Sequence, residues 1–531
     1  MKKMSKIILE SVKTRLFIAF YLLTALGAGF LTLYANGLLV RVLNAHLMVQ
    51  KFDGFAVLLL LTVGIFALIS GLLLLGEYFH VDFEYTTISN LARYYTARLL
   101  RAAHHYFNNK PVPEIYAGLW TASQATGRFF STLLRMVSVV VVFIFYGIVV
   151  FRIDLWAGIF TVVAIPVYFL VTAGVGNKIS DLQQAYVANI GDLATVTQEA
   201  LENAGNAKTK NAYAFLTRRV TGVLQKIKSV VVGVTVFNGY ISSITGLINR
   251  VAPLLVIFAA IFLSPTFEGN TGNIMVLFIN IPLFLNGASD IHRQFIAYKM
   301  TKPFLEKLAE FENAPLETEG GVDITSFKNL RTAGVKVTFE GGRIITVPDF
   351  TLKQGEKIMF FGESGIGKST VFNLIIGLNR EYEGDIYIND INLREISLTS
   401  LRRVFGITFQ HTNALTLDLK DNILLGAEKS DAALAQFIQL TALETQQENK
   451  AEVILNNKVL SGGEKSRIGL AQMLVPEPEV MLIDEAFSSV DEEMESLIIK
   501  NICNTYPQRA VICISHRNSG KQFFDRVVAF N

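Results

Sequence analysis

The stretch GESGIGKST, from Gly362 to Thr370, directly follows the short apolar segment KIMFF at 357–361. Its three glycines let backbone N–H groups turn inward, which is how such a loop cradles the phosphates of a nucleotide. The apolar run VFNLIIGL at 371–378 indicates a helix, whose N-terminus adds a positive dipole beside the loop. The order of strand, glycine-rich turn and helix predicts a nucleotide-binding α/β domain.

Two positions of this loop have a specific chemical role in the prediction. Lys368 would reach the β- and γ-phosphate oxygens, and the hydroxyl of Ser369 would bind Mg²⁺. The loop residues expected to bind the nucleotide are Gly362, Glu363, Ser364, Gly365, Ile366, Gly367, Lys368, Ser369 and Thr370.

The composition differs from that of a soluble enzyme. Of the 531 residues, 51% are apolar and only 18% are charged, with a mean hydropathy of +0.40, which indicates a membrane component of more than one domain. A net charge of +3 is too small to indicate nucleic acid as a partner. The two cysteines, Cys503 and Cys513, favour reduced thiols over a disulfide framework or a zinc site.

Six apolar runs approach the ~20 residues that a bilayer-spanning helix requires. They lie at about 16–40, 55–77, 132–151, 155–176, 247–264 and 273–289. Pro166, Pro253 and Pro282 fall inside three of them, which membrane helices tolerate better than soluble ones. Buried helices of a soluble protein are the alternative, but the number and length of the runs favour a six-helix transmembrane domain in a lipid bilayer.

The distribution of Lys and Arg predicts the orientation of these helices. Basic residues gather in the N-terminal segment and in the connections 78–131 and 177–246, whereas the alternate connections are almost free of them. By the positive-inside rule, both ends of the chain and both long connections are cytoplasmic. The apolar run after the basic N-terminus is too long for a signal peptide, so an uncleaved membrane anchor is expected.

Both long connections have helical periodicity, so the membrane helices are expected to continue into the cytosol. Local interruptions at 108–118 and 203–215 predict a short helix at each tip, suited to contact with another domain; simple helix hairpins are the alternative. The acidic segment ENAPLETEGG at 312–321 is typical of a linker. The expected domains are a transmembrane domain at 1–311, a linker at 312–326 and a nucleotide-binding domain at 327–531.

A second motif, EVMLIDEAFSSVD at 479–491, begins with a run typical of a buried parallel strand. The strand ends in two carboxylates, at the edge where open α/β sheets bind their ligands. Asp484 is predicted to hold Mg²⁺, and Glu485 is predicted to polarise the attacking water.

A third motif, VLSGGEKSRIGLAQ at 459–472, places Ser461, Gly462 and Gly463 before a helix, which makes a second anion-binding helix start. Here the chain resembles the ABC ATPases, whose signature is LSGG followed by Gln or Glu, with Glu464 in the last position. The segment SSVD at 488–491 then resembles the D-loop of that family.

The resemblance implies further functional residues. FGITFQHTN at 405–413 looks like the glutamine loop, with Gln410 as its glutamine, and AVICISHR at 510–517 ends in a residue that matches the switch histidine, His516. Phe339 lies where the family places an aromatic ring against adenine. The implied catalytic set is Glu485, His516 and Gln410, and the implied Mg²⁺ ligands are Ser369, Gln410 and Asp484.

As a whole the chain resembles an exporter-type half-transporter of the ABC family. The resemblance implies ATP and Mg²⁺ as cofactors, coupling helices at 108–118 and 203–215, and a second half-transporter as partner, with a homodimer preferred to a heterodimer. The phosphate loop of one subunit would then face the signature of the other. A multi-pass protein of a bacterial inner (plasma) membrane, with its N-terminus and ATPase domain in the cytoplasm, is expected.

The expected function is ATP-driven export of an amphipathic or hydrophobic peptide or drug-like molecule by alternating access. A lipid flippase of the same architecture and a non-transporting, ATP-switched membrane protein are the alternatives. Candidate cavity residues are Arg135, Asn280, Asn286 and Asp290, although interfacial anchoring also suits Arg135 and Asp290.

The chain departs from the family pattern in three ways. ENKAEVILNNKV at 448–459 lacks the TEVGERG-like run that many exporters of the family use near the coupling helices. The chain ends 15 residues after His516, so no C-terminal regulatory domain is expected. Nor is a peptidase domain expected ahead of the first span.

Overall fold

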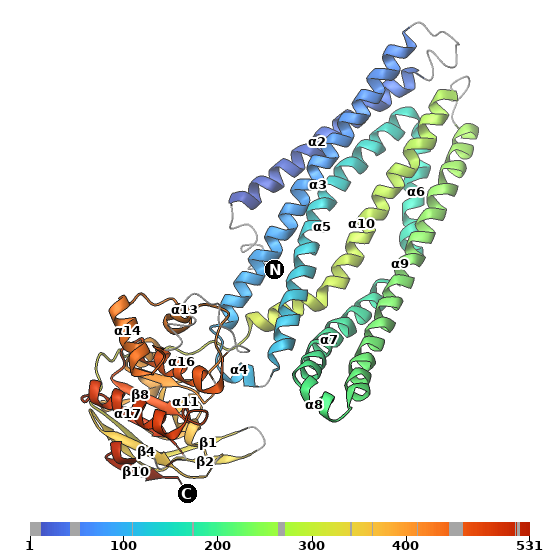
Figure 1. The fold of residues 1–531 in the computed structure, drawn as a ribbon. Coiled ribbons are helices and arrows are strands. Elements are labelled where there is room, and N and C mark those ends of the chain that lie inside the picture. Colours follow the sequence, from blue (N-terminus) through green and yellow to red (C-terminus); the bar gives the residue numbers. More distant parts are fainter. Residues whose placement is uncertain are drawn as a thin grey trace. The chain divides into compact units, whose positions relative to one another are not determined.

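The computed structural model describes residues 12–42, 54–108, 110–172, 175–263, 271–339, 342–363, 365–410, 412–444, 460–515, 517 and 521–530. They form two compact units, a helical unit that ends at Pro315 and an α/β unit that consists of the chain from Leu316 together with the short segment Ala103–His105 (Figure 1). The boundary between the units falls inside the segment 312–326 predicted to be the linker.

The helical unit contains, in chain order, α2 Val12–Arg41, α3 Phe55–Leu99, α4 His105–Asn108, α5 Val112–Ile153, α6 Leu155–Thr172, α7 Val175–Glu202, α8 Ala204–Thr209, α9 Tyr213–Leu263 and α10 Thr271–Glu312. Five of the described helices, α2, α3, α5, α9 and α10, are long and apolar enough to cross a membrane. A helical transmembrane domain is therefore confirmed. The predicted fourth span at 155–176 coincides with α6 but runs into 173–174, outside the described residues, so the count of six stays a prediction.

Four of these helices are much longer than a bilayer requires. α3, α5, α9 and α10 contain 45, 42, 51 and 42 residues. At about 1.5 Å per residue they measure roughly 63–77 Å, about twice the ~30 Å hydrocarbon core of a membrane. The helices are therefore long enough to continue well beyond the bilayer, as expected; that these extensions lie in the cytosol stays a prediction.

The two predicted interruptions have different outcomes. At 203–215 the chain forms the short helix α8 between the ends of α7 and α9, as predicted. Near 108–118 a short helix also forms, α4 His105–Asn108, but the interruption is misplaced: it begins earlier, at Leu100, and α5 already occupies the segment from Val112. The reason is Pro113, which occupies the first turn of α5, where a missing N–H costs no helical hydrogen bond.

Close backbone approaches hold the helical unit together. α2, α3, α5 and α10 pack on one another, and α6 and α7 pack on α9. At Gly127 of α5 a Cβ would lie 2.3 Å from a side-chain carbon of Ile88 on α3, so this crossing requires glycine. Small residues at helix crossings allow the close packing on which membrane helix association depends.

The α/β unit contains two five-stranded sheets. Its elements are β1 Asn329–Thr338, β2 Ile344–Thr346, β3 Thr351–Lys353, β4 Lys357–Phe361, α11 Lys368–Ile375, β5 Glu383–Ile388, β6 Ile391–Asn392, η3 Leu393–Glu395, α12 Leu398–Val404, β7 Phe405–Thr408, α13 Leu419–Leu424, α14 Asp431–Leu440, α16 Gly462–Leu474, β8 Val480–Asp484, α17 Glu492–Thr505, β9 Ala510–Ile514, η4 Lys521–Phe523 and β10 Arg526–Ala529. One sheet is parallel, in the order β10-β4-β9-β8-β7. The other is antiparallel, in the order β2-β1-β5-β6, with β3 also paired to β1.

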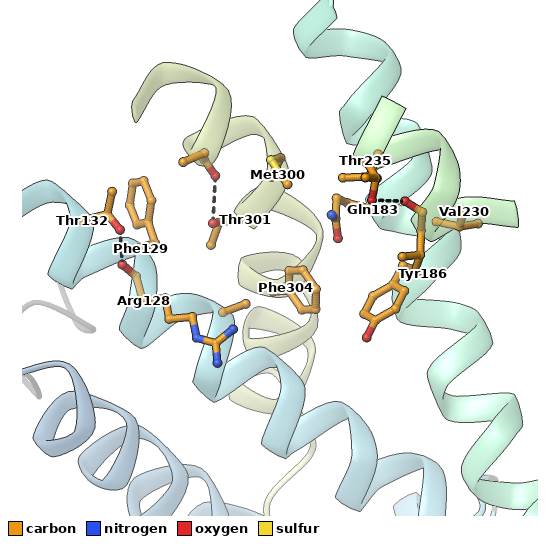
Figure 2. Close-up of a pocket in the computed structure, with 14 residues that line it drawn as sticks. Arg128, Phe129, Thr132, Gln183, Tyr186, Val230, Thr235, Met300, Thr301 and Phe304 are labelled. Atoms are coloured by element: carbon orange, nitrogen blue, oxygen red, sulfur yellow. Dashed lines mark hydrogen bonds between the residues drawn. The ribbon is translucent and has the colours of Figure 1, made fainter. Parts of the chain in front are cut away.

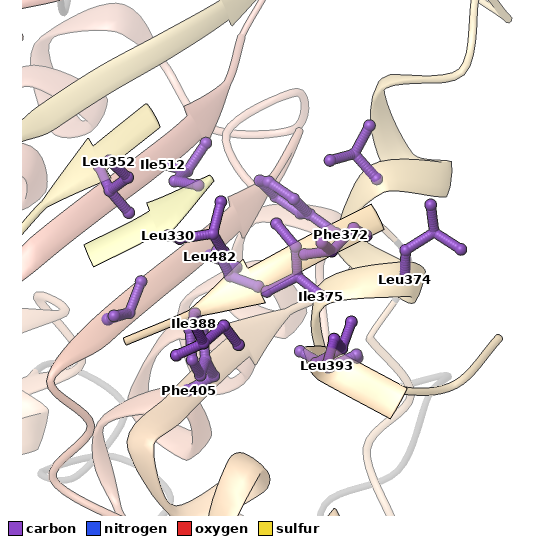
Figure 3. Packing of buried hydrophobic residues seen from close by; sticks show 14 of the residues in the cluster. Leu330, Leu352, Phe372, Leu374, Ile375, Ile388, Leu393, Phe405, Leu482 and Ile512 are labelled. Carbon is purple, nitrogen blue, oxygen red and sulfur yellow. The ribbon is translucent and has the colours of Figure 1, made fainter. Parts of the chain in front are cut away.

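The parallel sheet is buried on both faces, as its apolar strands predict. Leu482 and Ile512 pack with α11 and the antiparallel sheet, in the cluster shown in Figure 3. Met481 and Ile483 point to the opposite face and pack with residues of α16 and α17. Cys513 belongs to this second cluster and is a free thiol, in line with the reduced cysteines predicted from the sequence.

Part of the predicted linker packs along η3 and α12. The N–H groups of Gly321 and Val322 both donate to the carbonyl of Glu395, at 3.0 and 2.9 Å. Arg402 of α12 donates two hydrogen bonds of 2.7 Å to the carboxylate of Glu317, the bidentate geometry that gives such pairs their strength. These residues are therefore an ordered part of the α/β unit.

Candidate nucleotide-binding site

The site lies at one edge of the parallel sheet. β4, β9, β8 and β7 are neighbours and run in the same direction, so the loops that follow them leave from a common edge. These loops carry the phosphate loop, the segment with His516, the pair Asp484–Glu485, and Gln410. Ligands of open α/β sheets bind at this carboxyl edge.

The backbone of the phosphate loop requires glycine. Gly365 and Gly367 have φ values of +80° and +113°, which L-residues adopt only with strain. A Cβ at Gly367 would also lie 2.3 Å from Ile345 of β2. Gly367 caps the N-terminus of α11, so the loop and helix present their N–H groups together.

Lys368 is buried against the loop, with 4% of its surface exposed. Its Nζ donates hydrogen bonds of 2.8 Å to the carbonyls of Gly362 and Glu363. Burial lowers the pKa of the Lys368 ammonium, while the carboxylates of Glu485 and Asp484 oppose that shift. The carbonyl groups of the phosphate loop therefore hold the ammonium in place.

Ser369 and Asp484 form a set of oxygen donors that suits Mg²⁺. The Ser369 hydroxyl donates to Asp484 Oδ1 at 2.9 Å, and Asp484 is only 5% exposed. Burial raises the pKa of Asp484 to about 6, with the hydrogen bond from Ser369 acting in the opposite direction. Mg²⁺ prefers hard oxygen ligands and is usually bound by one or two carboxylates together with substrate phosphates.

The described residues contain no group of three or more His, Cys, Asp or Glu side chains placed to hold a metal ion. A Mg²⁺ ion that completes its coordination with nucleotide oxygens and water needs no such cluster. The donor set at Ser369 and Asp484 therefore fits the predicted ion.

Gln410 and Glu485 meet although they are 75 residues apart. Gln410 Nε2 donates to Glu485 Oε2 at 2.7 Å, which leaves the amide oxygen of Gln410 available as a metal ligand. Glu485 has a φ of +45°, unusual for a residue other than glycine. Its N–H donates to the carbonyl of Ile514 at 3.1 Å, so β9 holds the end of β8 in this conformation.

The signature residues form the start of α16. Ser461 is the N-cap, and a capping box joins it to Glu464: Ser461 Oγ accepts from the Glu464 N–H at 3.2 Å, and Glu464 Oε2 accepts from the Ser461 N–H at 2.7 Å. Glu464 therefore stabilises this helix start, which explains why Glu is suited to the position.

The signature also packs against the D-loop. A Cβ at Gly462 would lie 3.0 Å from Ser489 Cβ, and one at Gly463 would lie 2.9 Å from the Ser489 carbonyl oxygen. α16 packs with Met481 and Ile483 on one face of the parallel sheet, whereas α11 packs with Leu482 and Ile512 on the other. The helix that follows the signature and the helix that follows the phosphate loop therefore pack on opposite faces of the parallel sheet.

Two arginines at the site were missed by the sequence reasoning. Arg343 donates to the carbonyl of Gly365 in the phosphate loop. Phe339 donates its N–H to the Arg343 carbonyl at 2.8 Å and leaves a ring that is 41% exposed. The expected adenine platform is therefore on the same hairpin that contacts the phosphate loop.

The second missed residue is Arg517, next to His516. Its guanidinium donates to the carbonyls of Val490 at 2.5 Å and Ser488 at 3.2 Å, both in the D-loop. It also lies 3.4 Å from the carboxylate of Glu495, which is fully buried. The sequence signal was an arginine directly after the predicted switch histidine, but nothing local indicated its distant acceptors.

Ser364, His516 and the segment 448–459 lie outside the described residues. The structure brings together Gln410, Asp484 and Glu485 with the described part of the loop 362–370. The roles assigned to all of these residues stay predictions.

The candidate cavity residues of the helical unit separate into two groups. Arg135, Asn286 and Asp290 line one cavity of about 320 Å³, together with Glu77. Asn280 lies elsewhere, fully buried, and donates to Asn36 Oδ1 of α2 at 2.9 Å. Asn280 therefore joins two helices and does not line this cavity.

Comparisons with known proteins agree with both halves of the chain. Residues 345–488 match the family model "ABC transporter", and residues 18–287 match "ABC transporter transmembrane region". The second match covers 270 of the 531 residues, more than half of the chain. The chain belongs to the ABC transporter family, as a transmembrane region followed by an ATP-binding region in the half-transporter arrangement, and it is a multi-pass membrane protein.

Curated relatives differ in what their names state. The chain is 22% identical to an ATP-dependent lipid A-core flippase 2 of Colwellia psychrerythraea, over 74% of this chain and 69% of that one. It is also 22% identical to a multidrug resistance ABC transporter ATP-binding and permease protein of Lactococcus lactis, over 67% and 62%. Two other curated relatives are matched over 32% and 36% of their length, so the chain spans about a third of those proteins.

The fold has a close counterpart among solved structures. A bacterial Atm1-family ABC exporter with ATP bound superposes with a TM-score of 0.82, over 98% of this chain and 94% of that one. At 19% identity this likeness establishes the fold alone.

Proposed function

We propose that the chain is one half of a dimeric ATP-driven exporter that moves an amphipathic or hydrophobic molecule across a membrane by alternating access. One observation carries the proposal: a phosphate loop, Asp484, Glu485 and Gln410 converge at one sheet edge, in the same chain as helices long enough to cross a bilayer.

Hydrolysis would depend on positioning and charge. Phosphoryl transfer needs little covalent help from protein, so catalysis consists mainly of holding the phosphates and the attacking water in line. Lys368 would bind the β- and γ-phosphate oxygens, and Glu485, oriented by Gln410, would polarise the water. Bound Mg²⁺, held by Ser369, Asp484 and Gln410, would neutralise developing negative charge, and His516 would act as the switch residue.

A second half-transporter would complete the site. The chain has one phosphate loop and one signature, and the helices that follow them, α11 and α16, pack on opposite faces of the parallel sheet. Two chains would place Ser461–Glu464 of each against ATP bound to the other, and the intact catalytic set favours a homodimer. ATP would then stabilise the closed dimer through contacts absent from the open one, which is how a ligand shifts a conformational equilibrium.

Two substrate classes fit this architecture. A drug-like or peptide substrate agrees with the similarity to a multidrug resistance protein, and a lipid agrees with the similarity to a lipid A-core flippase. A non-transporting, ATP-switched protein is a third candidate, disfavoured by the complete set of catalytic residues. The basic connections favour a cytoplasmic N-terminus and ATPase domain in a bacterial inner membrane.

The test is reconstitution of the purified protein into proteoliposomes. ATP-dependent movement of labelled drug, peptide or lipid should occur with the wild type and stop with Glu485→Gln, which serves as the matched inactive protein. ATP turnover without movement of any of these classes would exclude the export proposal, and absence of turnover would favour the switch.

A further inference from the structure

The helical unit contains a cavity of about 410 Å³ where α5 and α10 approach α7 and α9 (Figure 2). This size is in the range of pockets that bind drug-sized molecules. All of the residues that line it belong to the four helices, so the cavity lies within one folded unit. Nothing in the ATPase cycle proposed above uses these residues.

The walls of the cavity are effectively apolar. The apolar residues that line it include Phe129 of α5, Met300 and Phe304 of α10 and Val230 of α9 (Figure 2). Three threonines also line it, but each hydroxyl already donates to a carbonyl of its own helix: Thr132 to Arg128, Thr235 to Val231 and Thr301 to Ala297, at 2.6–2.9 Å. They therefore present methyl groups and lone pairs and offer no free donor.

Polar donors come from two opposite walls. Arg128 lies on α5, and Gln183 and Tyr186 lie on α7 across the cavity (Figure 2). Among the described residues, no hydrogen bond involves the Gln183 amide, the Tyr186 hydroxyl or the terminal nitrogens of Arg128. An occupant that accepts hydrogen bonds would find partners on both sides.

Among the described residues that line the cavity, Arg128 is the sole charged one. Its Nε lies 3.6 Å from Glu84, and its side chain is 65% exposed. A charge-assisted hydrogen bond is shorter, at about 2.7–2.9 Å, and Glu84 also accepts from Ser131 at 3.2 Å. The guanidinium is therefore only loosely paired and keeps most of its donors for a ligand.

We propose that this cavity binds an amphipathic anion of drug size, with its carboxylate or phosphate at Arg128 and its apolar body between Phe129 and Phe304. A cationic amphipath would meet Arg128 with no carboxylate among the described lining residues, and a neutral one would leave the guanidinium with only its loose contact to Glu84, 3.6 Å away. That this anion is the transported substrate rests on the proposed export function; that it binds here does not.

The second cavity makes a useful comparison. It is lined by Arg135, which lies seven residues further along α5, but also by the carboxylates Glu77 and Asp290. Those carboxylates would repel an anion. The two cavities therefore predict opposite roles for two arginines of one helix, so Arg135→Gln is the matched control for Arg128→Gln.

The experiment measures binding to the full chain in phosphatidylcholine nanodiscs, without ATP. Three fluorescent probes share a dansyl-undecyl body and end in a carboxylate, an amide or a trimethylammonium group; empty nanodiscs correct for partition into lipid. The carboxylate should bind most tightly. Arg128→Gln should weaken it about 10-fold or more, the loss expected for a charge-assisted hydrogen bond, and should leave the amide probe nearly unchanged.

A second variant moves affinity in the other direction. Glu84→Gln removes the charge that competes for Arg128 but keeps an acceptor for Ser131, so carboxylate affinity should rise by up to about 5-fold. General damage to the fold cannot produce such a gain. Phosphatidic acid added to the nanodiscs as a competitor identifies the source: displacement of the carboxylate probe indicates a bilayer lipid, and no displacement indicates a water-borne anion.

Equal losses in Arg128→Gln and Arg135→Gln, or tighter binding of the trimethylammonium probe than of the carboxylate, would overturn the proposal. Because binding is measured without ATP, a failure of ATP-driven transport leaves this result intact. Conversely, transport that persists after loss of selective carboxylate binding would refute the cavity assignment and leave the export function standing.

Discussion

The clearest test of the ATPase site is to replace Glu485 and Lys368 separately, because the structure assigns them different surroundings. In Glu485→Gln the new amide oxygen can still accept the hydrogen bond that Gln410 donates to Glu485 at 2.7 Å. Gln410 is exposed, so even complete loss of this bond would change stability by no more than about 1 kcal/mol. The effect on folding should be negligible.

The effect on chemistry should be much larger. A positioned general base typically contributes about 10²–10⁴-fold, which corresponds to roughly 3–5 kcal/mol of activation free energy. Glu485→Gln should therefore bind ATP with near wild-type affinity, retain it in a closed dimer and turn it over at least about 10²-fold more slowly.

Lys368→Ala should show the opposite pattern. The ammonium is buried and donates two hydrogen bonds to loop carbonyls, and hydrogen bonds to charged groups contribute about 1.5–3 kcal/mol each. Loss of the phosphate contact should weaken ATP binding by at least about 10-fold. The assay is ATP retention on a filter beside steady-state phosphate release, for both variants and the wild type. Near wild-type turnover in Glu485→Gln would show that Glu485 only ends a strand.

The remaining predictions concern the dimer, the loop, the D-loop and coupling. Ser461→Arg should abolish turnover while each subunit still binds ATP; turnover by a monomer in detergent would contradict the dimer. Gly367→Ala should destabilise the loop and weaken ATP binding, since its Cβ would meet Ile345 at 2.3 Å, whereas Gly205→Ala in α8, which meets no atom within 4 Å, should leave binding unchanged. Arg517→Ala removes two hydrogen bonds to the D-loop and the contact with buried Glu495. The free energy of unfolding should therefore fall by about 2–3 kcal/mol after allowance for the partial exposure of Arg517. An unchanged melting temperature in scanning fluorimetry would show that these contacts do not stabilise the D-loop. Tyr213→Ala, at the exposed start of α9, should lower substrate-stimulated turnover more than ATP binding, and equal transport before and after the change would exclude a coupling role.

Much of the fold followed from local chemistry. Apolar runs of bilayer length predict membrane helices because the cost of exposing backbone in lipid leaves few other structures, and α2, α3, α5, α9 and α10 confirm them. The phosphate loop was predictable for a similar reason, since positive φ values at Gly365 and Gly367 exclude most other residues. The interruption predicted at 108–118 was misplaced because Pro113, in the first turn of α5, allows a helix to begin there.

The sequence by itself therefore determined the class of each segment, because glycine turns, capping residues and apolar periodicity act within a few residues of one another. The family resemblance implied that Ser369, Gln410, Asp484 and Glu485 act at one site. Only the tertiary structure decided the contacts themselves: Gln410 with Glu485, Ser369 with Asp484, and Arg517 with the D-loop. The same holds for the cavity residues, because Asn280 is turned toward Asn36 while Arg128 faces Gln183 and Tyr186 across a space enclosed by four helices. Such contacts depend on how whole helices and strands pack, and the free energy of that packing is spread over many residues, so no short stretch of sequence encodes it.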